Sequence, residues 1–197
     1  MTQDKPVFGL VLAGGESKRM GRDKALLLVG GETQLSRAVT LLESKLDTVF
    51  VSTRVDQQDE PERKKYQQIV DRYEDMGPLA GILSAMESFP DVGWLALACD
   101  LPNVDVHTIE YLINNRSYEH PFTAYRSSHD GLPEPLCAFY APGSSEVVKG
   151  FADDGVICPR KIMIRSDTKL LDQANPESLD NINTPEDLAR TGLKAAS

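Results

Sequence analysis

An apolar run at residues 7–12 leads directly into a stretch with three glycines and four cationic side chains, and this junction constrains the fold more than any other part of the chain. The glycines are Gly14, Gly15 and Gly21, and the cations are Lys18, Arg19, Arg22 and Lys24. Glycine lets a backbone turn tightly and approach a ligand closely. Exposed backbone N–H groups followed by Lys and Arg suit a phosphate chain. The stretch therefore predicts a buried strand that ends in a phosphate-binding loop.

The alternative for this stretch is a solvated loop with scattered charges. The whole chain carries a formal net charge of −9, however, so background composition does not explain a local excess of cations. The two commonest phosphate-loop patterns, GxxxxGK[ST] and GxGxxG, do not occur here. The acidic balance argues against an extended nucleic-acid groove but not against a nucleotide, which needs only a local cluster.

Apolar patterns along the rest of the chain alternate between strand and helix. In the first part we expect strands at residues 48–52, 68–70 and 94–98, helices at residues 34–45 and 82–88, a helix marked by Val106, Ile109, Leu112 and Ile113, and a polar loop or exposed helix at residues 56–65. In the second part we expect strands at residues 122–125, 136–140 and 168–171, a loop at residues 127–135, and helices at residues 144–151 and from Thr184 onward. This alternation predicts an α/β fold with a mostly parallel sheet covered on both faces. No repeat or linker divides the chain, so we expect one domain over residues 1–197.

Two aspartates follow expected strands, Asp71 after residues 68–70 and Asp100 after residues 94–98. In open parallel sheets, ligands bind beyond the carboxyl ends of the strands. The glycine loop, Asp71 and Asp100 can therefore meet at one edge of the sheet. A carboxylate that faces a triphosphate is a natural ligand for Mg²⁺, and we assign this role to Asp100. The alternative is that Asp100 begins the Leu101-Pro102 turn or caps the next helix.

The cysteines predict a reducing environment. Cys99, Cys137 and Cys158 are odd in number and widely spaced, so we expect free thiols rather than disulfides or a zinc ribbon. No signal peptide or membrane-spanning apolar run is evident. We therefore expect a cytoplasmic protein without a membrane or nucleic-acid partner.

Four motifs together point to a known family. They are Leu12-Ala13-Gly14-Gly15 with Ser17, Arg19-Met20-Gly21 and Asp23-Lys24; Gly77-Pro78-Leu79-Ala80-Gly81; Cys99-Asp100-Leu101-Pro102; and Asn181-Ile182-Asn183-Thr184-Pro185-Glu186-Asp187-Leu188. In these motifs, which span nearly the whole chain, the sequence resembles the nucleotidyltransferases related to molybdenum cofactor guanylyltransferase, the MobA type. The resemblance implies a Rossmann-like three-layer α/β/α sandwich of the nucleotide-diphospho-sugar transferase kind. It also implies transfer of GMP from GTP to molybdopterin with Mg²⁺ as cofactor and release of pyrophosphate.

The resemblance also implies roles for individual residues, with the nucleotide held by about residues 1–115 and the acceptor by about residues 116–190. The expected catalytic residues are Arg19, Lys24 and Asp100, with Asp100 also the metal ligand. The expected nucleotide-binding residues are Leu12, Ala13, Gly14, Gly15, Lys24, Thr53, Asp71, Gly77, Pro78, Leu79, Gly81 and Asp100. The acceptor-binding residues that it implies are Asn181 and Asn183. Apart from the resemblance, we assign Arg160 and Lys161 to the acceptor phosphate, because they form the one compact basic cluster in the second half of the chain; the alternative is a solvated surface turn. Arg favours phosphate through its planar fork of donors.

Other functions remain open at this stage. A relative of the same fold could use CTP or a sugar-phosphate acceptor, although the CTP-using relatives tend to carry Leu-Ala-Ala-Gly in the first loop, where this chain has Gly14. A nucleotide-binding regulator without turnover is a further alternative, which the presence of both Lys24 and Asp100 disfavours. We expect a monomer that makes transient contact with other molybdenum cofactor proteins.

Overall fold

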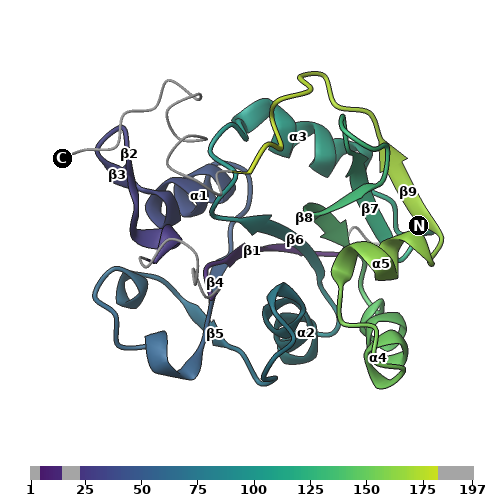
Figure 1. The fold of residues 1–197 in the computed structure, drawn as a ribbon, viewed down its shortest axis with the longest axis horizontal. Coiled ribbons are helices and arrows are strands. Elements are labelled where there is room, and N and C mark those ends of the chain that lie inside the picture. The colour runs from purple at the N-terminus through teal and green to yellow at the C-terminus, as the bar shows by residue number, and fades with distance from the viewer. Residues whose placement is uncertain (1–4, 15–22, 182–197) are drawn as a thin grey trace.

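The computed structural model describes residues 5–14 and 23–181. Their backbone forms three layers, with a seven-stranded sheet between two layers of helices (Figure 1). The strand order across the sheet is β5-β4-β1-β6-β8-β7-β9. The strands are β1 (Val7–Leu12), β4 (Val49–Thr53), β5 (Gln68–Val70), β6 (Gly93–Ala98), β7 (Phe122–Arg126), β8 (Pro133–Tyr140) and β9 (Thr168–Leu171).

One strand runs against the others. β8 pairs antiparallel with both β6 and β7, whereas β1 pairs parallel with β4 and β6, β4 with β5, and β7 with β9. The sheet is thus mostly parallel, as the alternation of strands and helices predicts. β1 and β6 are buried because strands flank them on both sides and helices cover both faces, which explains their continuous apolar sequences.

Helices cover the two faces of the sheet in separate groups (Figure 1). On one face lie α1 (Gln34–Glu43) and α3 (Val106–Asn115), whose buried side chains Leu35, Leu42 and Ile109 share a cluster with Val11 and Leu97. On the other face lie α2 (Pro78–Ser88), α4 (Ser145–Asp153) and α5 (Pro159–Ile164), which bury Ile82, Val148 and Met163 against Leu10 and Trp94. The three-layer α/β/α sandwich is therefore confirmed.

Several short elements connect the layers at the edge where β1 ends. A 3₁₀ helix η1 (Lys24–Leu26) leads into the hairpin of β2 (Leu28–Val29) and β3 (Glu32–Thr33). Gly30 and Gly31 turn this hairpin with φ of 65° and 93°, values that side chains other than glycine rarely adopt. Two further 3₁₀ helices, η2 (Val55–Gln57) and η3 (Arg63–Lys65), lie between β4 and β5.

Several element boundaries differ from prediction, and the two largest differences are at the starts of α2 and β8. The helix expected at residues 82–88 begins already at Pro78, because proline fits the first helical position and Gly77, with φ of 55°, makes the turn before it. The loop expected at residues 127–135 ends at Pro133, where β8 begins. The basic segment Pro159-Arg160-Lys161 is the first turn of α5. The helix expected from Thr184 lies outside the described residues.

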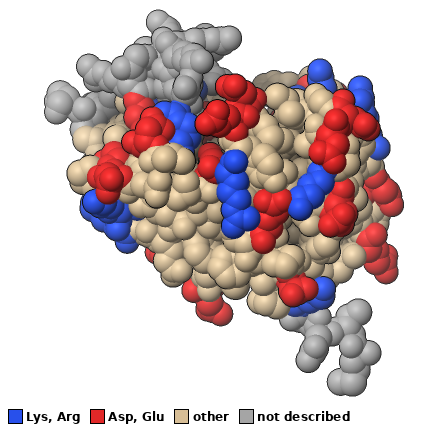
Figure 2. Space-filling model, turned by 90° about the horizontal axis from the view of Figure 1, so that it is seen from below, with Lys and Arg blue, Asp and Glu red and all other residues tan. Residues whose placement is uncertain are grey.

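Residues 5–14 and 23–181 include no helix that is both long enough and apolar enough to cross a membrane. On the face shown in Figure 2, basic side chains stand among acidic ones rather than forming a continuous basic surface.

Candidate nucleotide-binding site

A cavity of about 720 Å³ lies beyond the carboxyl ends of β1, β4, β5 and β6. From β1 the chain continues to β4 and β5 on one side of the sheet, and later to β6 on the other side of β1. Open parallel sheets bind ligands at the edge where strand connections diverge in this way. Nine of the expected nucleotide-binding residues line the cavity: Leu12, Ala13, Gly14, Lys24, Asp71, Gly77, Pro78, Gly81 and Asp100.

Lys24 and Asp100 face each other in this cavity. Asp23 caps η1 by accepting a hydrogen bond from the backbone N–H of Ala25 at 3.0 Å, which fixes the start of the turn that carries Lys24. Lys24 Nζ lies 3.5 Å from Asp100 Oδ2. Burial raises the pKa of the Asp100 carboxyl, and the nearby Lys24 opposes that rise. The cavity thus combines a cation with a partly buried carboxylate.

Asp71 is held on the opposite wall by Ser52. The Ser52 hydroxyl donates a 2.6 Å hydrogen bond to Asp71 Oδ1. Burial raises the pKa of Asp71, while the Ser52 hydrogen bond and the Arg54 charge lower it. A Cβ at Gly81 would lie 2.1 Å from Ser52 Oγ, and one at Gly14 would lie 3.0 Å from Asp71 Oδ2. These two glycines therefore leave the space that the Ser52–Asp71 pair occupies.

Arg54 supports the backbone at the end of β1. Its Nη1 donates to the carbonyl oxygen of Gly14 at 3.2 Å, while Nε and Nη2 donate to the two carboxylate oxygens of Asp56 at 2.9 and 2.8 Å. Because two donors engage Asp56, the guanidinium has a fixed orientation over Gly14.

A second cavity, of about 690 Å³, adjoins the first. The two share the wall formed by residues 75–78 and Leu136. Arg160, at the start of α5, lines the second cavity, as does Asn181. The Arg160 guanidinium lies 3.0 Å from Asp130 and 2.7 Å from Glu134, so the cation is oriented by two carboxylates.

The donors around the first cavity fit one mode of metal binding. Residues 5–14 and 23–181 contain no group of three or more His, Cys, Asp or Glu side chains placed to hold an ion on their own. Mg²⁺ is usually bound through one or two carboxylates together with substrate phosphates. A single half-buried carboxylate such as Asp100, beside a cavity, suits that arrangement.

Comparison with known proteins identifies the family. The model of the MobA-like NTP transferase domain matches residues 9–168. The chain belongs to this family. The resemblance inferred from the four motifs is therefore confirmed.

Individual proteins also match most of the chain. A molybdenum cofactor biosynthesis bifunctional protein of Synechocystis is 38% identical over 92% of the chain, although the match spans only 52% of that longer protein. A probable molybdenum cofactor guanylyltransferase of Nostoc is 33% identical over 91% of the chain and 87% of its own length. The crystal structure of molybdopterin-guanine dinucleotide biosynthesis protein A from Archaeoglobus fulgidus superposes with a TM-score of 0.74 at 23% identity, covering 93% of this chain and 95% of that one.

Three expected site residues lie elsewhere in the structure. The described residues that line the two cavities do not include Thr53, Leu79 or Lys161. Thr53 is fully buried and donates a hydrogen bond to Gln68, because its side chain points to the opposite face of β4 from that of Ser52. Leu79 lies in the core, and Lys161 is exposed on α5. Gly15, Arg19 and Asn183 lie outside the described residues.

The structure also adds residues that the sequence analysis did not assign. Ser52 and Arg54 line the first cavity, one on each side of Thr53 in the chain. The alternation of side chains along β4 could have indicated Ser52, because residues two apart in a strand share a face. Nothing in the sequence indicated Arg63 in this way.

Proposed function

We propose that this chain transfers GMP from GTP to molybdopterin and releases pyrophosphate. The observation that carries the proposal is the shared wall between the two cavities, since a nucleotide in the first and an acceptor phosphate in the second would meet at residues 75–78 and Leu136. The names of the relatives support the same reaction. In that reaction, an acceptor phosphate oxygen forms a bond to the α-phosphorus of GTP as the bond from that phosphorus to the bridging oxygen breaks.

The residues of the site act mainly by neutralising and orienting negative charge. A terminal phosphate is largely ionised near neutral pH, so the attacking oxygen needs no strong general base. The obstacle is the approach of two anions, which a cation such as Lys24 reduces. Arg160 lines the second cavity, and its guanidinium would serve the acceptor phosphate there. Lys24 would therefore bind the nucleotide, and Arg160 would bind the acceptor.

We assign a Mg²⁺ site to Asp100, completed by the phosphates of GTP. When bound, the ion supplies further neutralisation of the triphosphate. Asp100 and Lys24 stand close enough to contact the same phosphate group from two sides. We also place the reaction in the cytoplasm, in a monomer that contacts other molybdenum cofactor proteins only transiently.

Pyrophosphate release measured with GTP, CTP and ATP, each with molybdopterin, with a sugar phosphate and without an acceptor, tests the proposal. We expect release that requires GTP and molybdopterin together. Release with CTP in place of GTP would show a cytidylyltransferase, and release with a sugar phosphate in place of molybdopterin would show a different acceptor. GTP binding by calorimetry without any turnover would show a nucleotide-binding regulator.

Gly14 provides a sharper test of the guanine assignment. A Cβ at this position would lie 3.0 Å from Asp71 Oδ2 and 3.6 Å from Arg54 Cγ, so it would narrow the cavity beside both side chains. We expect Gly14→Ala to weaken GTP binding about tenfold and to affect the smaller CTP less. Equal loss for the two nucleotides in calorimetry would remove Gly14 as a determinant of base size.

A further inference from the structure

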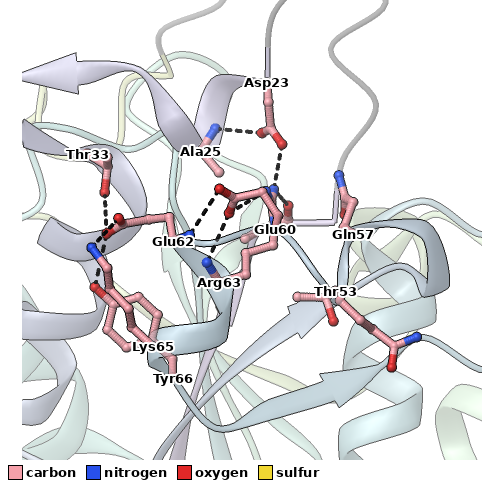
Figure 3. Close-up of polar contacts among 12 residues, drawn as sticks. Asp23, Ala25, Thr33, Thr53, Gln57, Glu60, Glu62, Arg63, Lys65 and Tyr66 are labelled. Carbon is pink, nitrogen blue, oxygen red and sulfur yellow. Dashed lines mark hydrogen bonds and ion pairs between the residues drawn. The ribbon is translucent and has the colours of Figure 1, made fainter.

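Arg63 is a fully buried arginine on η3, and its guanidinium lies beside both ends of the glycine-containing stretch (Figure 3). Its Nη2 donates a 2.7 Å hydrogen bond to the carbonyl oxygen of Ala13, directly after β1. The same Nη2 lies 2.7 Å from Asp23 Oδ2, directly before Lys24. One side chain therefore links the two points where the described chain enters and leaves residues 15–22.

The guanidinium is itself held in one orientation. Nη1 lies 3.5 Å from Glu60 Oε2, and that same carboxylate oxygen accepts a 2.9 Å hydrogen bond from the backbone N–H of Arg63. Nε is buried and has no partner among the described residues. A charge buried this deeply is costly unless it is paired, so a chain that needed only an apolar contact here would gain from a hydrophobic side chain.

The segment that carries Arg63 is attached to the rest of the fold by its neighbour Glu62. This carboxylate accepts hydrogen bonds from Thr33 Oγ1 at 3.3 Å and from the Tyr66 hydroxyl at 3.4 Å, and it pairs with Lys65 (Figure 3). Thr33 in turn caps α1 by accepting from the N–H of Ser36. η3 is thus fixed to α1, and Arg63 projects from a stable support.

Asp23 connects Arg63 to the cavity. One of its carboxylate oxygens pairs with Arg63, and the other accepts from the N–H of Ala25 and begins η1. Lys24, the first residue of η1, then reaches to 3.5 Å from Asp100. The position of the Lys24 ammonium therefore depends on where Arg63 holds Asp23.

We propose that Arg63 is a positioning residue, which sets the backbone of Ala13 and the turn bearing Lys24 relative to each other so that Lys24 meets the phosphates of the nucleotide. This inference rests on the proposed GTP-dependent reaction. Arginine suits the role because one terminal nitrogen, Nη2, contacts both the Ala13 carbonyl and Asp23 while the other, Nη1, faces Glu60. Lysine would keep the charge but could not span all three partners.

Steady-state kinetics of Arg63→Lys and Asp23→Asn test the inference, with Arg126→Lys as the matched control. Arg126 pairs with Asp172 at 3.1 Å on the surface and lines neither described cavity. We expect both test variants to raise KM for GTP and lower kcat, with kcat/KM reduced about tenfold, or 1.4 kcal/mol. The control should match the wild type. Asp23→Asn keeps a side-chain oxygen that can cap η1, so this variant still tests the inference if Arg63→Lys does not fold.

A double-mutant cycle with Lys24→Ala separates positioning from general damage. If Arg63 acts through Lys24, Arg63→Lys should cost less than about threefold once Lys24 is absent. Two results would overturn the inference. One is a double mutant in which the two losses of kcat/KM multiply. The other is a lower kcat with unchanged KM, which would indicate a smaller fraction of active protein. A wild-type protein that releases no pyrophosphate from GTP would instead contradict the proposed function.

Discussion

Replacing Gly81 by alanine should destabilise the protein by about 2 kcal/mol, although the same change inside a helix is normally favourable by about 1 kcal/mol. Gly81 lies on α2 against β4, where an added Cβ would meet Ser52 Oγ at 2.1 Å, Ser52 Cβ at 2.9 Å and Asp71 Oδ1 at 3.2 Å. The first two distances are shorter than real Cβ contacts, so the Ser52 side chain must move. Its movement breaks the 2.6 Å hydrogen bond to Asp71.

The magnitude follows from two costs and two effects that offset them. Overpacking a buried site costs about 1–3 kcal/mol, and loss of a hydrogen bond to a charged group costs roughly 1.5–3 kcal/mol when it is complete. The gain in helix propensity and partial relaxation of Ser52 offset part of that cost, which leaves about 2 kcal/mol. For a chain of this length the Tm should fall by about 4–8 °C. GTP binding should weaken as well, because Asp71 loses the donor that orients it.

Gly150 offers a matched control on α4. It is exposed, and a Cβ there would meet nothing within 4 Å. Gly150→Ala should therefore show only the helix-propensity gain and raise Tm by about 2–4 °C. Thermal unfolding followed by circular dichroism would measure both variants. A Tm that rises in Gly81→Ala as it does in Gly150→Ala would refute the steric argument.

Three further predictions concern charge. Asp100→Asn should lower kcat by about a hundredfold. It should not lower Tm at neutral pH, because burial disfavours the charged carboxyl that the change removes. A fall in both the rate of pyrophosphate release and the Tm would contradict this prediction. The raised pKa of Asp100 means that its ionisation costs stability as pH rises from 3.8 through the raised value, so the advantage of Asp100→Asn in urea unfolding should grow across that window, and a constant difference would contradict it. Arg160→Gln should raise KM for molybdopterin about tenfold and leave GTP affinity unchanged, whereas Lys161→Gln should alter neither. Equal kinetics for the two variants would show that Arg160 is a surface charge without a role in acceptor binding.

The sheet was predictable because its strands are short apolar runs bounded by polar residues. The expected ranges for β1, β5 and β9 coincide with the observed strands. The range for β4 is one residue too early at both ends, and that for β6 starts one residue too late. The predicted start of α2, residue 82, is too late because the apolar run that marks the helix begins there, whereas the helix itself begins at Pro78. Only Gly77 turns the chain, whereas Gly81 is a helical residue chosen for the space it leaves beside Ser52.

The site was predictable where a residue lies just beyond the end of a strand, as Gly14, Asp71 and Asp100 do. Arg63 could not be found in this way. It sits in a polar stretch that predicts exposure, and its burial depends on partners from distant parts of the chain, Ala13 and Asp23, as well as on the nearby Glu60. No local pattern encodes such a contact, because it exists only after β1, η1 and η3 have come together.

The antiparallel strand β8 has a consequence for how this protein is made. β6 is one of the most apolar strands of the sheet, and the chain supplies its neighbour β1 before it but its neighbour β8 only from Pro133 onward. During synthesis, β6 therefore emerges from the ribosome with one row of backbone N–H and C=O groups unpaired. An unpaired apolar edge is a template for association with other chains. Nascent chains that stop before β8 should be the aggregation-prone species, and synthesis through Tyr140 supplies the strand that pairs with this edge of β6.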